Sequence, residues 1–364
     1  MNRTDPKSNA PIMMLSAGNG FIMQSEKYSR DNAGQSLKKY ILLKQGELAY
    51  NHGASKAKQF GCCYELTEPE ARIPYVYHCF KINDHEYTPF IAMALNNAKM
   101  DKQLKRLVSS SVRMDGLLNI SFEDYMSVTL HLPSSTEQKH IADFLKKIDE
   151  RIAAQEKLLA SLKKYKRGLL MHYFSDDKTQ LWTQCSVSQI GKVITGSTPP
   201  TNDRSNYDGD LLFCAPGDVG EQKHISSTEK RVSPKGFALG RPLPPNSVIV
   251  TCIGLIGKLG IAKTSMITNQ QINALVVSEG FDHEFIYYAF ENFFPEYRSK
   301  VSMQTLPILS KSEFEKLMIK VPDLDVQHKI SSHLAAMDRR IEHTQQELNA
   351  LIEHRRGIMQ QLFI

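Results

Sequence analysis

The chain has 364 residues, of which 41% are hydrophobic, and a formal net charge of +6. That length suffices for two globular domains. The sequence contains no run of about eighteen apolar residues and no apolar core of a signal peptide, so we expect a cytoplasmic protein. No segment concentrates the positive charge, which argues against a nonspecific nucleic-acid binder that relies on many phosphate contacts. Six cysteines without metal-ligand spacing indicate buried reduced thiols rather than a metal site.

Residues 1–131 form the first expected globular unit. Apolar runs at 12–15, 40–43, 48–50 and 73–80 are separated by Gly and Asn, a pattern typical of a mixed, β-rich domain. A helix is expected over residues 88–97.

Residues 132–174 predict a long helix. Apolar side chains recur at alternating steps of three and four, which is the pattern of a coiled-coil seam. About forty helical residues at about 1.5 Å each would form a rod of about 60 Å. The seam residues that we single out are Ile141, Leu145, Ile148, Ile152, Leu159 and Leu162.

Residues 175–320 predict a second globular unit with the same order of elements. Strands are expected near 211–214, 247–253 and 272–277, and a helix over 283–293. Residues 43–51 align loosely with 243–251, and Phe90-Ile91 aligns with Phe285-Ile286. Residues 120–125 align with 309–314, and a strand-like run into a proline follows each of these two stretches. The stretch 187–200 has no counterpart before Ile12, so we expect the first unit to be shorter by about twenty-five residues.

Residues 321–364 repeat the rod. The offset of 189 residues between Pro133 and Pro322 also separates Gln138 from Gln327 and runs through the whole stretch without a gap. The seam is repeated at Ile330, Leu334, Met337, Ile341, Leu348 and Leu351. Such duplication dictates architecture. We therefore predict an α+β fold with a pseudo-twofold internal repeat, in which two similar mixed, β-rich domains are separated by two long antiparallel coiled-coil helices.

Three stretches resemble catalytic motifs only superficially. Residues 254–258, GLIGK, lack the spacing of a phosphate-binding loop and predict a β-turn. Residues 198–201, TPPT, lack the flanking side chains of an amino-methyltransferase site, and residues 137–139, EQK, are interpreted as a capping turn at a helix start. We expect no catalytic residue and no metal in this chain.

What remains is polar, amide-rich loop chemistry of the kind that contacts DNA. Asn and Gln can form paired hydrogen bonds with adenine, Arg and Lys with guanine, and Ser, Thr or Lys with the backbone. For each residue the alternative is a solvated loop or a hydrogen-bond set at a strand end. The candidates are Asn51, His52, Ser55, Lys56, Lys58, Ser110, Arg113, Thr195, Ser197, Thr198, Lys258, Asn269, Gln270, Gln271, Asn273, Gln304 and Thr305. Lys163, Lys164, Lys166 and Arg167 of the first rod are expected on a solvated or partner-facing surface.

The duplicated rods, each starting near a proline and a glutamine as in Pro133–Gln138 and Pro322–Gln327, resemble the specificity subunit of type I restriction-modification systems. The resemblance covers essentially the whole chain, and Gly196–Pro200 is similar to the usual start of that family's target recognition domains. It implies target recognition domains at 1–131 and 175–320, a central conserved helix at 132–174, and a C-terminal conserved helix at 321–364 that pairs with it.

The resemblance also implies a function and partners. Each recognition domain would read one half of a split double-stranded DNA target, and the helices would fix the gap between the halves. The subunit would be noncatalytic and bind two methyltransferase subunits and, through them, restriction subunits. S-adenosylmethionine, ATP and Mg are expected on those partners, with no cofactor in this chain. The short first unit departs from the family pattern.

Two other functions stay open at this point. The chain could be a structural scaffold whose coiled coil joins two ligand-binding lobes without DNA recognition. A self-sufficient methyltransferase would need a cofactor loop, which we do not find in the sequence.

Overall fold

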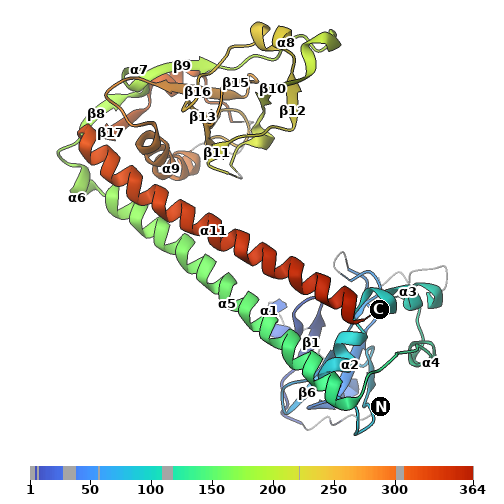
Figure 1. Cartoon of the computed structure of the whole chain (residues 1–364). Helices are drawn as coiled ribbons and strands as arrows, with labels where there is room; N and C mark the ends of the chain where they lie inside the picture. Colours follow the sequence, from blue (N-terminus) through green and yellow to red (C-terminus); the bar gives the residue numbers. More distant parts are fainter. Residues whose placement is uncertain are drawn as a thin grey trace. The chain divides into compact units, whose positions relative to one another are not determined.

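The computed structural model describes Asp5 and residues 8–27, 38–55, 58–108, 118–220, 222–300 and 307–363. The chain divides into two compact units, each described here by itself: unit 1 is Met1–Glu156 with Gln346–Ile364, and unit 2 is Lys157–Gln345. Each unit combines one mixed domain with one half of each of two long helices (Figure 1). Among the described residues, no helix is both long enough and apolar enough to cross a membrane.

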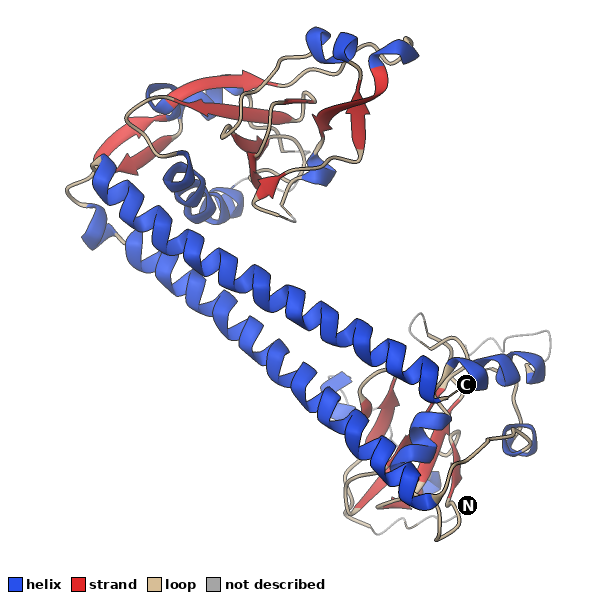
Figure 2. Cartoon of the chain, in the orientation of Figure 1, coloured by secondary structure: helices blue, strands red, loops and turns tan. Residues whose placement is uncertain are grey.

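Unit 1 contains short sheets with helices packed on them (Figure 2). The strands form a hairpin of β1 (Met13–Ser16) and β2 (Gly20–Met23), a pair of β3 (Ile41–Lys44) and β6 (Glu70–Ile73), and a sheet ordered β5 (Cys62–Glu65), β4 (Leu48–Asn51), β7 (His78–Phe80). The helices are α1 (Gln24–Lys27), α2 (Thr88–Ala94), α3 (Ala98–Leu107) and α4 (Phe122–Met126). The helix expected over 88–97 is α2, and it ends early because the Asn97 side chain caps α3 by accepting from the Met100 N–H.

Unit 2 is built around a five-stranded sheet. Its order is β11 (His224–Ile225), β14 (Leu259–Ala262), β13 (Val248–Thr251), β16 (Ile272–Val277), β9 (Gly191–Thr195). Two smaller sheets are ordered β12 (Lys230–Val232), β10 (Tyr207–Cys214), β15 (Met266–Thr268), and β17 (Met318–Val321), β8 (Thr183–Ser186). The helices are α6 (Asp176–Thr179), α7 (Val187–Ile190), α8 (Pro234–Leu239), α9 (His283–Lys300) and α10 (Lys311–Lys316).

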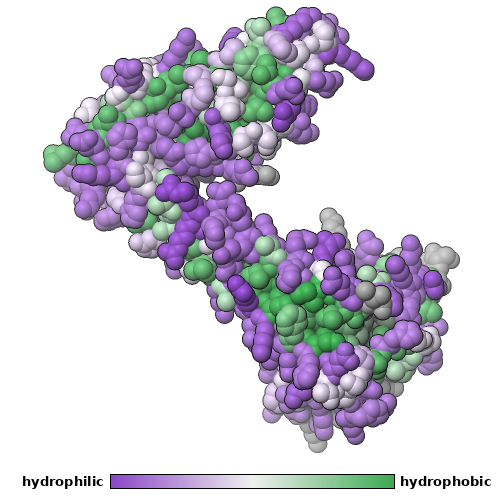
Figure 3. Space-filling model, viewed as in Figure 1, coloured by the Kyte–Doolittle hydropathy of each residue, from purple (hydrophilic) through white to green (hydrophobic). Residues whose placement is uncertain are grey.

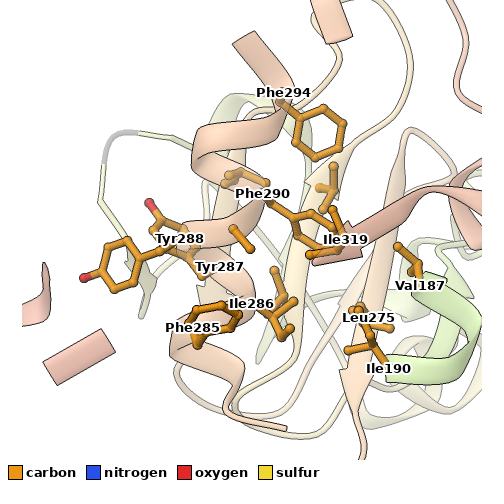
Figure 4. Close-up of a cluster of buried hydrophobic side chains, with 14 of the residues drawn as sticks. Val187, Ile190, Leu275, Phe285, Ile286, Tyr287, Tyr288, Phe290, Phe294 and Ile319 are labelled. Carbon is orange, nitrogen blue, oxygen red and sulfur yellow. The ribbon is translucent and has the colours of Figure 1, made fainter. Parts of the chain in front are cut away.

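The core of unit 2 lies between α9 and this sheet. Figure 4 shows Ile286 and Phe290 of α9 turned toward Leu275 of β16 and Ile319 of β17. All four side chains are at most 5% exposed. Because burial of each such side chain is worth about 1.5–3 kcal/mol, this face of α9 is a main source of the unit's stability.

The two units share a core arrangement. In unit 1, β4 lies between β5 and β7 and is antiparallel to both; in unit 2, β13 lies in the same way between β14 and β16. The register agrees as well, since Tyr50 pairs with His78 where Val250 pairs with Asn273. The predicted internal repeat is confirmed at the level of strand pairing.

One expected element differs between the repeats. The strand-like run before Pro322 is β17, which pairs with β8, whereas residues 128–132, before Pro133, are not a strand. A strand needs a hydrogen-bonded neighbour, and the described part of unit 1 supplies none that corresponds to β8.

The rods are α5 (Ser135–Tyr173) and α11 (Leu324–Leu362), each of 39 residues and therefore about 58 Å long at about 1.5 Å per residue. Every seam position that the sequence singled out is buried or half-buried. Figure 3 shows mainly hydrophilic side chains along the helices in that view, and an apolar area on unit 1.

Two polar side chains, Lys166 and Arg355, occupy equivalent positions in the two rods, 189 residues apart, and both form ion pairs. In unit 1, the Arg355 guanidinium donates to both carboxylate oxygens of Asp149. In unit 2, the counterpart Lys166 lies 2.7 Å from the carboxylate of Asp338 and 2.8 Å from that of Glu291. Lys166 was expected on a solvated or partner-facing surface; the prediction is wrong, because its side chain, 13% exposed, lies between two carboxylates that compensate its burial.

Each rod also begins on a buried glutamine. Gln138 accepts from the Tyr87 N–H (3.0 Å) and donates to the Pro133 carbonyl (3.0 Å). Gln327 accepts from the Asp282 N–H (2.9 Å) and donates to the Pro322 carbonyl (2.8 Å). Tyr87 and Asp282 immediately precede α2 and α9, so the glutamine joins the rod to the domain helix. The sequence suggested only a capping turn at residues 137–139. In the structure, Gln138 also joins the rod to the domain.

The cysteines are free thiols, and all except the half-buried Cys185 are buried. Burial raises the pKa of Cys63 to about 12 and that of Cys214 to about 12. The expectation of buried, reduced thiols is confirmed for these residues. No group of three or more His, Cys, Asp or Glu side chains with metal-site geometry occurs within the described ranges.

Candidate nucleic-acid interface

In unit 2, several strands end at one edge of the domain. Thr195, the last residue of β9, pairs with Asn273; Thr251, the last residue of β13, pairs with Ile272; and Cys214 pairs with Thr268. The loops that follow these ends therefore lie together. They are residues 196–201, 215–220, 252–258 and 269–271. Main-chain bonds join them, from Ser197 N to Thr268 O (2.8 Å) and from Cys252 N to Gln271 O (2.8 Å).

This edge carries a cluster of amide and hydroxyl side chains. The exposed Thr198 hydroxyl donates to Gln270 Oε1 at 2.7 Å, and Asn269 Nδ2 donates to Gln271 Oε1 at 3.1 Å. Asn269 Oδ1 in turn accepts from the Gln271 N–H. The Thr198 contact holds the Gln270 amide through its oxygen and does not use its NH₂ group, and the residue is exposed. A positioned glutamine amide is suited to bind the edge of an adenine.

Two basic side chains lie at the same edge. Arg241 donates from Nη1 to the Thr195 carbonyl at 2.9 Å and is otherwise exposed. Lys258 follows the turn at 252–257 and runs beside Gly220, where an added Cβ would lie 3.5 Å from Lys258 Cδ. Arg and Lys can contact phosphates or guanine. Lys258 was among the predicted residues, whereas Arg241 was not, because no local pattern in the sequence marks it.

The predicted β-turn at 254–258 is a turn in the structure. Gly254 and Gly257 have φ of +75° and +77°, and a Cβ at Gly257 would lie 2.5 Å from the Phe294 ring. Both positions therefore favour glycine. The turn presents Leu255, which is 60% exposed and which the sequence analysis also missed. An exposed apolar side chain beside amides can contact a thymine methyl group.

Two candidate side chains in unit 2 form hydrogen bonds within the domain. Asn273, 1% exposed, accepts from the Thr195 hydroxyl at 2.6 Å and donates to the Leu309 carbonyl at 3.1 Å. Both belong to the hydrogen bonding that joins β9, β16 and residue 309. We therefore exclude Asn273 and Thr195 from the interface. Ser197, half-buried, remains at its border.

The corresponding loop of unit 1 follows β4. Asn51 caps its own turn by accepting from the Gly53 N–H, and Ser55 accepts from the Lys58 N–H. Lys58 Nζ donates to the Asn96 carbonyl just beyond α2, so its charge is directed at a helix end. His52 is 6% exposed, with its ring 4.9 Å from that of His78. Among the described candidates here, Ser55 is exposed, Asn51 and Lys58 are half-buried, and His52 is buried.

Five candidates lie outside the described residues. They are Lys56, Ser110, Arg113, Gln304 and Thr305.

Comparison with known proteins gives one family. The sequence profile described as the type I restriction modification DNA specificity domain matches twice, over residues 43–164 and 180–354. The two matches cover one repeat each and together more than half of the chain.

Two curated relatives carry related names. The chain is 29% identical over 178 residues to the type I restriction enzyme MjaIX specificity subunit of Methanocaldococcus jannaschii, which covers 47% of this chain and 41% of that protein. It is 29% identical over 108 residues to the type I restriction enzyme HindI specificity subunit of Haemophilus influenzae, which covers 29% of this chain and 24% of that protein. The chain thus aligns with less than half of each relative.

Solved structures share the fold. The S subunit of a type I restriction-modification system from M. genitalium matches with a TM-score of 0.60 and 14% identity, over 99% of this chain and 90% of that one. A chain from a structure on complex assembly and conformational transition of the type I R-M system matches with a TM-score of 0.58 and 16% identity, over 100% and 94%. Together with the two profile matches, the repeated domain and rod place the chain in its family: it belongs to the type I restriction modification DNA specificity domain family.

Proposed function

We propose that this chain is a noncatalytic subunit that recognises a bipartite double-stranded DNA target. In this proposal the domains at 1–131 and 175–320 each read one half-site, and the subunit directs methyltransferase and restriction subunits to that target. The observation that carries it is the loop edge of unit 2, where strand ends gather the exposed amide of Gln270 and the half-buried amides of Asn269 and Gln271 beside Arg241 and Lys258. Amides read base edges, and the two cations add phosphate contacts.

The repeat supports a split target. Two domains of the same arrangement, each attached by a buried glutamine to a stiff helix, are suited to read two separate sequences. A rod of about 58 Å is longer than one DNA turn of about 34 Å. We propose that rod length sets the gap between the half-sites.

The surface of α5 supports protein partners. Leu158 and Tyr165 lie one heptad apart, hence on one face of the helix, and are 41% and 55% exposed. Apolar side chains at this spacing on an exposed helix face fit the surface of a bound protein. We propose that methyltransferase subunits dock here and bring S-adenosylmethionine, while ATP and Mg belong to restriction subunits.

The test is DNA selection by the assembled complex. This chain is purified with type I methyltransferase subunits and mixed with a pool of random duplexes at several salt concentrations. We expect enrichment of two short sequences at a fixed separation, and affinity that falls with salt because phosphate contacts release counterions. A complex that assembles but enriches no sequence would favour the scaffold function and refute the proposal.

One variant makes this selection specific to the loop edge. Gln270→Ala removes the exposed amide and should relax one half-site only, at a cost of about 1–3 kcal/mol for a lost bidentate contact. Gln180→Ala, at an exposed position after α6, serves as the control and should leave the enriched sequences unchanged. If Gln270→Ala also leaves both half-sites unchanged, the loop edge is not the reading surface.

A further inference from the structure

In unit 2, one segment closes the domain core from outside. Residues 183–195 form β8, α7 and β9; β8 pairs with β17 and β9 with β16. Val187 and Ile190 of α7 are fully buried, and Val193 of β9 is 3% exposed. Figure 4 shows Ile190 beside Leu275, with Val187 close by. This strand–turn–strand segment therefore covers the apolar surface between β16, β17 and α9.

Unit 1 has the same apolar surface. Each position of this surface has a counterpart in unit 2. The counterparts follow from the strand register, from the start of the domain helix and, for residues 120–132, from the 189-residue offset. A groove in unit 1 is lined by Phe80, Ile82, Ile91, Leu95, Tyr125, Val128, Leu130 and Leu132. Their counterparts are Leu275, Val277, Ile286, Phe290, Phe314, Leu317, Ile319 and Val321, all of which pack in one cluster with Val187, Ile190 and Val193.

Two of the groove residues are clearly more open than their counterparts. Leu132 is 39% exposed, whereas Val321 is 4% exposed; Leu130 is half-buried, whereas Ile319 is 5% exposed. The nearby Met126 is 48% exposed. The part of this apolar surface formed by Leu130 and Leu132 therefore has no cover among the described residues, whereas its counterpart in unit 2 is covered, at about 25 cal/mol for each Å² left in water.

The main chain of residues 128–132 presents an open strand edge on the groove side. In unit 2, the Leu317 carbonyl accepts from the Val187 N–H at 2.9 Å, and Ile319 pairs with Cys185. For the counterparts Val128 and Leu130, the described residues contain no main-chain partner. An open edge of this kind accepts an added strand.

The opposite side of the same segment is already satisfied. The Thr129 N–H donates to Gln103 Oε1 at 3.0 Å, and Gln103 Nε2 donates to the Thr129 carbonyl at 2.9 Å. Neighbouring residues of an extended chain direct their main-chain groups to opposite sides. The Gln103 side chain therefore holds the segment extended and leaves the groove side for another strand.

We propose that this groove binds a strand–turn–strand segment of a partner polypeptide, with apolar residues at the positions that Val187, Ile190 and Val193 occupy in unit 2. Its first strand would pair along Val128–Leu132 as β8 pairs along β17. A second copy of this chain is not the expected occupant, because its own segment is buried in unit 2. The rim, formed by Lys81, Asn83 and Glu86, carries both charges and does not favour an anionic ligand. The proposal is independent of which DNA sequence the chain reads.

The probe is a labelled peptide with the sequence of residues 180–198 and Ser in place of Cys185, titrated into the full chain. We expect saturable binding, and slower amide exchange over residues 128–132 once the peptide is bound. A peptide with Ser at the positions of Val187, Ile190 and Val193 is the matched control, and it should bind roughly tenfold more weakly or worse, since its apolar contacts are lost.

Two variants of the chain locate the site. Leu130→Asp places a charge in the groove, and Leu132→Lys changes a residue that is exposed in the free chain and so leaves folding intact. Both should weaken peptide binding roughly tenfold or more. Leu239→Asp, at a 53% exposed position in unit 2, should have no effect. The proposal is overturned if the peptide fails to bind, if both groove variants bind it like the unchanged chain, or if residues 128–132 are already protected from exchange without it.

Discussion

Gln327 offers the sharpest test of how a rod is attached to its domain. The side chain is 2% exposed, accepts from the Asp282 N–H and donates to the Pro322 carbonyl. Gln327→Met keeps the volume but leaves both main-chain groups buried without a partner. An unsatisfied buried group costs about 1–3 kcal/mol, so the loss of both partners should lower the unfolding free energy of unit 2 by about 2–6 kcal/mol.

The chain provides its own reporter for this loss. Trp182 is the only tryptophan, and its ring lies 5.8 Å from that of Phe285 in the first turn of α9, three residues after Asp282. Urea unfolding followed by Trp182 fluorescence therefore reports on the region that Gln327 holds. Gln180→Met makes the same chemical change at an exposed position and should shift the transition little. A loss below about 0.5 kcal/mol for Gln327→Met would contradict an anchoring role for this glutamine.

Three further predictions concern the rods and a cap. Burial works against the charge of Lys166, but Glu291 and Asp338 outweigh it and raise the lysine pKa above its ordinary 10.5, so Lys166→Met should cost about 3–5 kcal/mol near neutral pH. Its difference from the unchanged chain in urea unfolding should shrink as the pH rises from 10.5, where the unfolded lysine loses its proton, through the higher pKa of the folded lysine. The Ser310 hydroxyl and N–H both donate to Glu313 and lower its pKa, so Ser310→Ala should raise the Glu313 pKa in an NMR titration, and an unchanged pKa would contradict the capping box. Adding one heptad to each rod, at the facing residues Gln155 and Glu347, lengthens the helices by about 10 Å and should widen the gap between half-sites by about three base pairs. An unchanged gap in DNA selection would refute the proposal that rod length sets this gap.

The rods were predictable because the spacing of apolar residues along a short stretch of sequence is enough to specify a long helix. A seam at alternating steps of three and four, repeated at a constant offset, defines both helices to within three residues at their starts. The role of Gln138 and Gln327 was not predictable in the same way. An identical glutamine after a proline is compatible with a capping turn, and only the tertiary approach of Tyr87 and Asp282 makes it an anchor.

The loop edge was predictable only in part. Asn269–Gln271 stood out by composition, but Asn273 looked equivalent to them because the boundary of β16 at Ile272 is not marked in the sequence. Arg241 reaches the edge through a contact with Thr195, 46 residues earlier in the chain. The difference between residues 128–132 and β17 likewise depends on a distant strand. These features depend on contacts and strand pairing between residues far apart in the sequence, which local sequence patterns do not reveal.

The central claim is that the two domains read two halves of one DNA target. The most direct measurement is sequencing of methylated sites in cells that express this chain together with type I methyltransferase and restriction subunits. We expect one motif with two short specified halves at a fixed separation, in which Gln270→Ala changes one half and leaves the other intact. An undivided motif, or a change in both halves with Gln270→Ala, would contradict it.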